Sequence, residues 1–121
     1  MYELMVEDTF DAAHQLRGYE GPCEKLHGHS FKVQLFIYGE TLDKHGMLMD
    51  FKKIKSLLSK ILKGFDHANL NELPEFQKEN PTSENIAKII FEKINDKIKL
   101  HIDRVSVWES PTTFASYLGP E

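Results

Sequence analysis

The chain has 121 residues and a formal net charge of −4, with 40% apolar and 28% charged residues. These values suit a single soluble domain over residues 1–121, and they disfavour nucleic acid as a partner because phosphate binding needs clustered lysine and arginine. Apolar runs of about 18 residues do not occur, so we expect no membrane-spanning helix. The single cysteine excludes an internal disulfide, and the acidic start lacks a basic signal region, so we expect a cytoplasmic protein.

Two long strands are predicted in the first third of the chain. Residues 2–14 alternate between apolar and polar side chains, which is typical of a strand with one buried face. Residues 27–38 alternate in the same way. Between them, residues 18–26 contain two glycines and a proline and predict a loop. The two strands should therefore form an antiparallel pair.

Helical spacing of apolar residues replaces the alternation in the middle of the chain. The stretch MDFKKIKSLLSKILKGF (49–65) predicts a helix, with Asp50 as its N-cap and Gly64 as its terminator. A second helix is predicted over residues 83–97, where Thr82 can serve as the N-cap. Both helices should pack one apolar face against a sheet.

The remaining segments complete the predicted fold. Residues 66–81 indicate a polar connector between the two helices, because they are polar and contain two prolines. Residues 100–109 and 113–118 predict a closing hairpin. The element order is therefore ββααββ. We expect an α+β fold in which two helices cover one face of a four-stranded antiparallel sheet.

Three histidines fall where the first two strands would bring them together. His27 and His29 are two residues apart on one strand, so their side chains point to the same face. His14 lies near the end of the preceding strand, in phase with its buried face. Three imidazoles and one open position are typical of a catalytic zinc site. Isolated histidines are more often surface or core residues, and that interpretation stays open on these observations alone.

Two other groups of residues are suited to proton transfer. Cys23 lies in the loop four residues before His27, where zinc and Lys25 would favour its reactive thiolate. The alternative for this cysteine is a small buried apolar side chain. Asp66 directly precedes His67, and a turn would let the carboxylate orient the imidazole. The alternative for this pair is a helix end with solvated polar groups.

Glu109 is a carboxylate in an apolar pattern. It shares one phase of its predicted strand with Val105 and Val107. A buried carboxylate is costly unless it has a partner. The side chain therefore either reaches water at the strand end or accepts hydrogen bonds from a ligand, for which the two N–H groups of an aminopyrimidine ring would be suitable.

Six short segments follow one another along the chain, and their combination and order are informative: FDAAHQL, CEKLHGHSF, GMLMDF, FDHANLN, NPTSENIA and VWES. In this combination the chain resembles the 6-pyruvoyltetrahydropterin synthase / 6-carboxytetrahydropterin synthase family over residues 4–118. The resemblance implies the tunnelling fold (T-fold), with 7,8-dihydroneopterin triphosphate as the substrate. It also implies a homohexamer, a dimer of two trimers, with active sites at the subunit interfaces.

The resemblance implies a role for each candidate residue. Zinc would be held by the three histidines already described. The implied catalytic residues are the loop cysteine as general base and the adjacent pair as proton relay: Cys23, Asp66 and His67. Glu109 would anchor the pterin ring, and residues of the PTSEN segment would lie near it: Thr82, Ser83 and Glu84. Lys25 and Arg17 are candidates for binding the triphosphate by position alone.

The residue Glu24 leaves the product open. Queuosine-pathway 6-carboxy-5,6,7,8-tetrahydropterin synthases, which release triphosphate and acetaldehyde, carry Cys-x-x-x-His-Gly-His, and Cys23 satisfies this pattern. A folate-pathway branch that makes 6-hydroxymethyl-7,8-dihydropterin carries Glu-x-x-His-Gly-His, and Glu24 satisfies that pattern too. We expect the carboxy product. One alternative is the hydroxymethyl product, made alone or as a second activity. If Glu24 has no part in catalysis, its side chain faces solvent. Another alternative is a non-catalytic pterin- or metal-binding module.

Overall fold

A computed structural model describes residues 1–18, 20–21 and 25–120. Its strands and helices follow the predicted order, with one short strand added: β1 (Tyr2–His14), β2 (His27–Gly39), α1 (Phe51–Leu62), β3 (Ala68–Asn69), α2 (Ser83–Asn95), β4 (His101–Ser110) and β5 (Thr113–Tyr117). The α+β prediction is therefore confirmed, and the ββααββ order holds apart from the short strand β3 between the helices. None of the helices among these described residues is long and apolar enough to cross a membrane.

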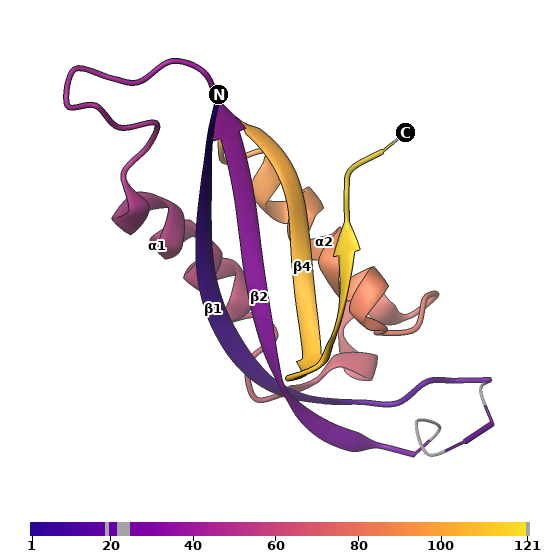
Figure 1. The fold of residues 1–121 in the computed structure, drawn as a ribbon. Coiled ribbons are helices and arrows are strands. Elements are labelled where there is room, and N and C mark those ends of the chain that lie inside the picture. The colour runs from indigo at the N-terminus through magenta and orange to yellow at the C-terminus, as the bar shows by residue number, and fades with distance from the viewer. Residues whose placement is uncertain (19, 22–24, 121) are drawn as a thin grey trace.

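The sheet is built around a long ribbon of β1 and β2. Its strand order is β3-β1-β2-β4-β5, and every pairing is antiparallel except the short one between β1 and β3. β1 and β2 pair along their whole length, from Tyr2 opposite Gly39 to His14 opposite His27. The pairing between β2 and β4 covers only residues 32–38 of β2. The histidine-bearing end of the ribbon therefore extends past that pairing (Figure 1).

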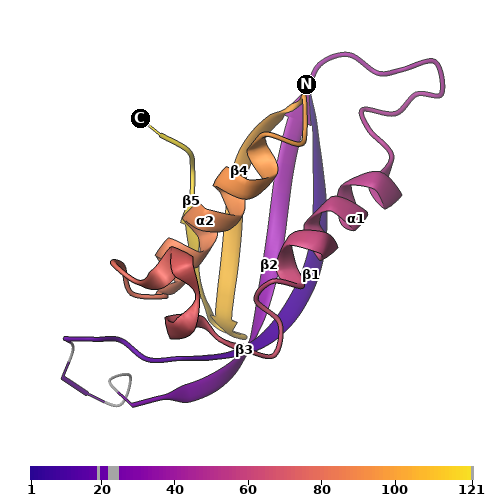
Figure 2. The ribbon, with the colours of Figure 1, turned by 180° about the vertical axis from the view of Figure 1, so that it is seen from behind.

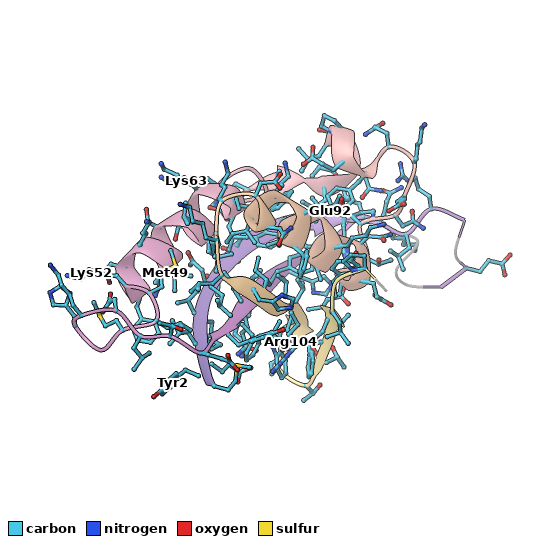
Figure 3. All side chains as sticks on the ribbon, turned by 90° about the horizontal axis from the view of Figure 1, so that it is seen from above. Tyr2, Met49, Lys52, Lys63, Glu92 and Arg104 are labelled. Atoms are coloured by element: carbon cyan, nitrogen blue, oxygen red, sulfur yellow. The ribbon has the colours of Figure 1, made fainter. Side chains whose placement is uncertain are left out.

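Both helices cover the same face of the sheet, as Figure 2 shows from behind. Viewed from above, Lys63 and Glu92 lie on the helix side of the strands and Arg104 lies on the other side (Figure 3). The alternating strand residues that point toward the helices form the core together with the apolar helix stripes. The largest fully buried side chains of this core are Phe10, Phe31, Phe65, Phe76, Leu35, Ile37, Ile54, Leu58, Leu70, Ile86, Ile90 and Ile94.

The predicted helix starts are confirmed by their caps. The Asp50 carboxylate accepts a hydrogen bond from the backbone N–H of Lys52 at 2.9 Å. The Thr82 hydroxyl accepts one from the N–H of Asn85 at 3.1 Å, which satisfies a donor of the first helical turn. The end of α1 agrees with the prediction, because the helix ends at Leu62 with Lys63 as its C-cap, and Gly64 follows directly.

The connector between the helices is more ordered than its polar composition predicts. It contains β3, which pairs in parallel with Ala12 and Ala13, and two 3₁₀ turns over residues 70–72 and 74–76. Leu70 and Phe76 from these turns are fully buried. Among the described residues, the sheet therefore has five strands instead of the predicted four. The added strand has only two residues, too few to produce a periodic pattern in the sequence.

Candidate metal centre and proton-transfer pair

The register of β1 and β2 brings three histidines to one place on the helix-facing side of the sheet. His14 lies directly opposite His27, and Ala12 lies opposite His29, so the three imidazoles project from the same face. The ring centroids are 4.6 Å apart for His14 and His27, 4.7 Å for His27 and His29, and 5.3 Å for His14 and His29. The structure thus brings together the three side chains predicted to hold a metal.

Backbone carbonyls fix the orientation of two of these rings. The Nδ1 atom of His14 lies 2.6 Å from the carbonyl oxygen of Pro81, and Nδ1 of His27 lies 2.7 Å from that of Lys25. A carbonyl oxygen can only accept a hydrogen bond, so Nδ1 carries the hydrogen in both rings. In each neutral ring, Nε2 then keeps a lone pair. Metal-binding histidines are commonly oriented in this way by a partner on the other ring nitrogen.

The Nε2 atom of His14 is buried and has no hydrogen-bond partner. Every other buried side-chain nitrogen or oxygen atom that the structure describes has such a partner. His14 is only 2% exposed. Such atoms are rare in folded proteins and call for an explanation, of which an ion at the site is one. A lone pair that faces the centre of a three-histidine cluster is the arrangement that a metal would satisfy. The described residues therefore fit a metal ion.

Glu109 completes the cluster from β4. Its Oε1 atom lies 3.0 Å from Nε2 of His14 and 3.2 Å from Nε2 of His29. One ligand atom from each of the four residues lies within 4.8 Å of the others. A lone pair and a carboxylate repel each other at this distance unless a proton or a metal cation lies between them. The carboxylate thus strengthens the case for a cation at the centre.

Glu109 lies at an irregularity in the sheet. The pairing of β4 with β5 shifts between Trp108, opposite Phe114, and Ser110, opposite Thr113. Such shifts redirect a side chain and are common beside active sites. Sequence reasoning predicted Glu109 as a ligand contact but missed its closeness to the histidines. The apolar phase that it shares with Val105 and Val107 was the available signal.

The surroundings of His29 affect the ionisation of its imidazole. Burial is the largest influence and lowers the pKa of the His29 imidazole below its ordinary value. The negative charge of Glu109 acts in the opposite direction, while the neighbouring His14 and His27 lower the pKa further. The neutral ring, which is the form that binds a metal, is therefore favoured at neutral pH.

Asp66 and His67 form the hydrogen-bonded pair that the sequence suggested. Nδ1 of His67 lies 2.9 Å from a carboxylate oxygen of Asp66. The required turn is present, because His67 adopts a left-handed φ of 57° and its N–H donates to the carbonyl of Asp11 at 2.6 Å. The N–H of Asp11 in turn donates to Asp66 at 2.9 Å, and this bond is the main reason that the pKa of Asp66 is lowered.

This pair stands apart from the histidine cluster in the same chain. Asp11 and Ser30 are opposite each other in the β1–β2 register, on the face of the ribbon away from His14. Asp11, Ser30 and His67 line a cavity of about 580 Å³, which His29 also touches. The structure therefore places the metal ligands and the Asp66–His67 pair in two separate groups on opposite faces of the ribbon.

The predicted ring-binding residues share a second, smaller cavity. Ser83, Glu84 and Glu109 line about 190 Å³ next to the hairpin of β4 and β5. This volume is below the range of about 300–1,000 Å³ that ligand pockets usually have. Thr82 is not part of the lining, and its hydroxyl serves as the α2 cap. A complete binding pocket would need further walls.

The remaining predicted residues differ in what the structure shows. Lys25 is exposed and holds His27 through its carbonyl. Arg17 does not present a free guanidinium, because it donates to the carbonyls of Phe76 and Glu79 and to the side chain of Asn80. This arrangement ties the end of β1 to the segment before α2. Cys23 and Glu24 lie outside the residues that the structure describes.

Known proteins resemble this chain over nearly its whole length. The family model for 6-pyruvoyl tetrahydropterin synthase matches residues 3–120. A Haemophilus influenzae relative named 6-carboxy-5,6,7,8-tetrahydropterin synthase is 35% identical, and the match covers 97% of this chain and 99% of the relative. A Synechocystis relative of the same name is 38% identical, and the match covers 99% of this chain and 95% of the relative. A Pyrococcus furiosus relative named dihydroneopterin monophosphate aldolase is 40% identical over 88% of both chains.

A solved structure shows the same fold. The Caenorhabditis elegans 6-pyruvoyl tetrahydropterin synthase matches with a TM-score of 0.89 at 28% identity, covering 98% of this chain and 96% of that one. This match confirms the tunnelling fold. The chain belongs to the 6-pyruvoyl tetrahydropterin synthase family.

Proposed function

We propose that this protein is a zinc-dependent lyase that converts 7,8-dihydroneopterin triphosphate into 6-carboxy-5,6,7,8-tetrahydropterin, with release of triphosphate and acetaldehyde. The product would serve queuosine precursor synthesis. Relatives that cover nearly the whole chain carry the name of this synthase. The structural observation that carries the proposal is the buried, unpartnered Nε2 of His14 at the centre of three converging imidazoles.

The histidine cluster is suited to zinc in a catalytic role. Three nitrogen ligands with an open position are typical of catalytic zinc, and His14, His27 and His29 would supply them. When bound, zinc would act as a Lewis acid toward the oxygens of the substrate side chain. Other divalent ions also accept imidazole ligands, so metal analysis of the purified protein has to accompany the activity test.

Glu109 would anchor the pterin ring beside the metal. Its carboxylate lies between the metal ligands and the small cavity that Ser83 and Glu84 line. A carboxylate there can accept two N–H hydrogen bonds from an aminopyrimidine ring, and charge-assisted bonds of this kind are strong. Substrate binding would draw the carboxylate toward the cavity and leave the three imidazoles to the metal.

The Asp66–His67 pair would move protons. Asp66 holds Nδ1 of His67, which leaves Nε2 as the nitrogen that can exchange a proton. The His67 side chain is 81% exposed in the single chain, as a group that serves a neighbouring molecule has to be. Cys23, from the loop before His27, would act as the general base on the bound substrate, with the pair as its relay.

We further propose that the protein is a homohexamer, a dimer of trimers with active sites between subunits. Three observations support an assembly. Within the described part of the chain, the outer edge of β1 is paired only at Ala12 and Ala13, so much of a long strand has an open edge there. The metal ligands and the proton-transfer pair lie on opposite faces of the ribbon. The cavity beside Glu109 is too small for a complete ligand pocket.

Replacement of Cys23 by alanine tests the catalytic assignment. The variant should still bind zinc, because the predicted ligands are unchanged, but it should make no 6-carboxy product from dihydroneopterin triphosphate. Product formation at the wild-type rate would overturn the role of Cys23. In the wild-type protein, bound zinc without any release of triphosphate would instead favour a non-catalytic pterin- or metal-binding module.

A second candidate function has a specific observation in its favour. The Pyrococcus furiosus relative at 40% identity is named an aldolase that acts on dihydroneopterin monophosphate. Side-chain cleavage of this kind would give 6-hydroxymethyl-7,8-dihydropterin for folate synthesis, with Glu24 as the catalytic group, alone or beside the first activity. Chromatography of the products of wild type and Glu24→Gln, with monophosphate and triphosphate substrates, separates the candidates. Identical product profiles would make Glu24 a bystander.

A further inference from the structure

Asp11 is a charged residue for which the proposed reaction has no role so far. Its backbone N–H donates to the Asp66 carboxylate at 2.9 Å, and its carbonyl accepts the N–H of His67 at 2.6 Å. Its own carboxylate accepts a hydrogen bond from the hydroxyl of Ser30, the residue directly opposite on β2. One residue of β1 therefore contacts both members of the proton-transfer pair and is itself held in place by a cross-strand partner.

The Asp11 side chain also places a second negative charge beside the imidazole. One ligand atom each from Asp11, Asp66 and His67 lies within 4.8 Å of the other two. Two carboxylates this close repel each other, and a cation between them relieves the repulsion. Within this group of three, the imidazole of His67 is the side chain that can become that cation.

We propose that Asp11 is a positioning residue, held by Ser30, whose carboxylate stabilises the cationic form of the His67 imidazole during proton transfer. This inference rests on the proposed function, because it assigns Asp11 to the same reaction. Asp11 does not touch the substrate in this account. It acts through His67, as a second carboxylate beside the one that orients the ring.

Substitution of Asp11 by asparagine isolates the charge. The backbone bonds to Asp66 and His67 do not depend on the side chain, and an amide oxygen can still accept from Ser30. The turnover number should fall about fourfold with KM unchanged, as expected for the loss of one charge at this distance in a largely aqueous setting. Ser30→Ala, which frees the carboxylate, should give a smaller loss in the same direction.

An NMR titration of the zinc-loaded protein tests the inference without turnover. The ring signals of His67 are assigned by their absence in His67→Gln. These signals should show that the imidazole loses its proton at lower pH in Asp11→Asn than in wild type. The other charged groups around the pair stay the same in both proteins: Asp8 and Lys63, which line a cavity with Asp66, and His29, which lines one with His67. Glu40→Gln, which also removes one exposed negative charge, should leave the titration unchanged.

The outcomes of this experiment are distinguishable from those of the proposed function. An unchanged His67 titration in Asp11→Asn and in Ser30→Ala would overturn the role of Asp11, whatever the enzyme makes. A shifted titration in a protein that does not convert dihydroneopterin triphosphate would support the positioning role and refute the proposed reaction. If Asp11→Asn fails to fold, the Ser30→Ala titration decides alone.

Discussion

Replacement of His14 by alanine should remove a metal ligand and a structural contact together, whereas replacement of His29 should remove mainly a ligand. His14 is 2% exposed and His29 is 29% exposed. The His14 ring donates to the buried carbonyl of Pro81 and packs edge-on against Phe31 with centroids 5.4 Å apart. His29 makes a similar edge contact with Phe31 at 5.6 Å but has a partly solvated ring.

The difference in unfolding free energy follows from these contacts. Loss of the His14 ring leaves a buried carbonyl unsatisfied, which costs about 1–3 kcal/mol, and removes an aromatic contact of about 0.5–1.5 kcal/mol. We therefore expect metal-free His14→Ala to lose about 2–4 kcal/mol relative to metal-free wild type. His29→Ala should lose about 1 kcal/mol or less, because it leaves no comparable buried group without a partner.

Urea unfolding of chelator-treated proteins at one fixed protomer concentration measures these losses, since assembly would otherwise change the apparent stability. Metal content of the untreated proteins, measured by mass spectrometry, should fall strongly in both variants. His45→Ala, which removes an exposed histidine outside the cluster, should keep the metal and the stability of wild type. Full metal content in His14→Ala and His29→Ala, or equal stability losses in the two, would refute the reasoning.

Three further predictions concern pH, assembly and Arg17. The folded state lowers the pKa of His29, so protonation of this imidazole favours the unfolded chain. The metal-free wild-type protein should therefore lose stability as the pH falls below about 6.5. Urea unfolding at several pH values measures this loss, which should be smaller in His29→Ala. Mixed refolding of inactive His29→Ala and His67→Ala subunits should restore part of the activity if each site draws on two subunits; mixtures as inactive as their parents would contradict this assembly. Arg17→Ala should lower the free energy of unfolding by roughly 1–2 kcal/mol, because two backbone carbonyls lose their hydrogen-bond donor, and KM for the triphosphate substrate should stay unchanged. A raised KM at wild-type stability would instead favour a phosphate-binding role for Arg17.

The long strands could be located from the sequence because one face of the ribbon is buried along most of its length. Alternation over residues 2–14 predicted β1 with the bounds that the structure has, and the histidines continued the apolar phase to the ribbon end. The first helix start was equally accessible, because an N-cap such as Asp50 acts on its immediate neighbours. Local patterns were sufficient wherever local interactions determine the structure.

The features that escaped prediction depend on contacts between distant segments. β3 exists because Ala68 and Asn69 pair with β1, more than 50 residues earlier in the chain, and two residues carry no periodic signal. The closeness of Glu109 to the histidines depends on how β4 lies relative to β1 and β2, which alternation along one strand does not reveal. The role of Arg17 as a structural donor was likewise hidden, because its acceptors are backbone carbonyls. The family resemblance located the site residues but could not show these contacts.

The central claim is tested most directly by identifying the product that the purified, zinc-loaded protein makes from 7,8-dihydroneopterin triphosphate. Chromatography and mass spectrometry should show 6-carboxy-5,6,7,8-tetrahydropterin, with triphosphate and acetaldehyde released in equal amounts. A protein that binds zinc at its histidine cluster and leaves this substrate unchanged would contradict the proposed lyase activity. A pterin that keeps a different side chain would contradict the proposed product.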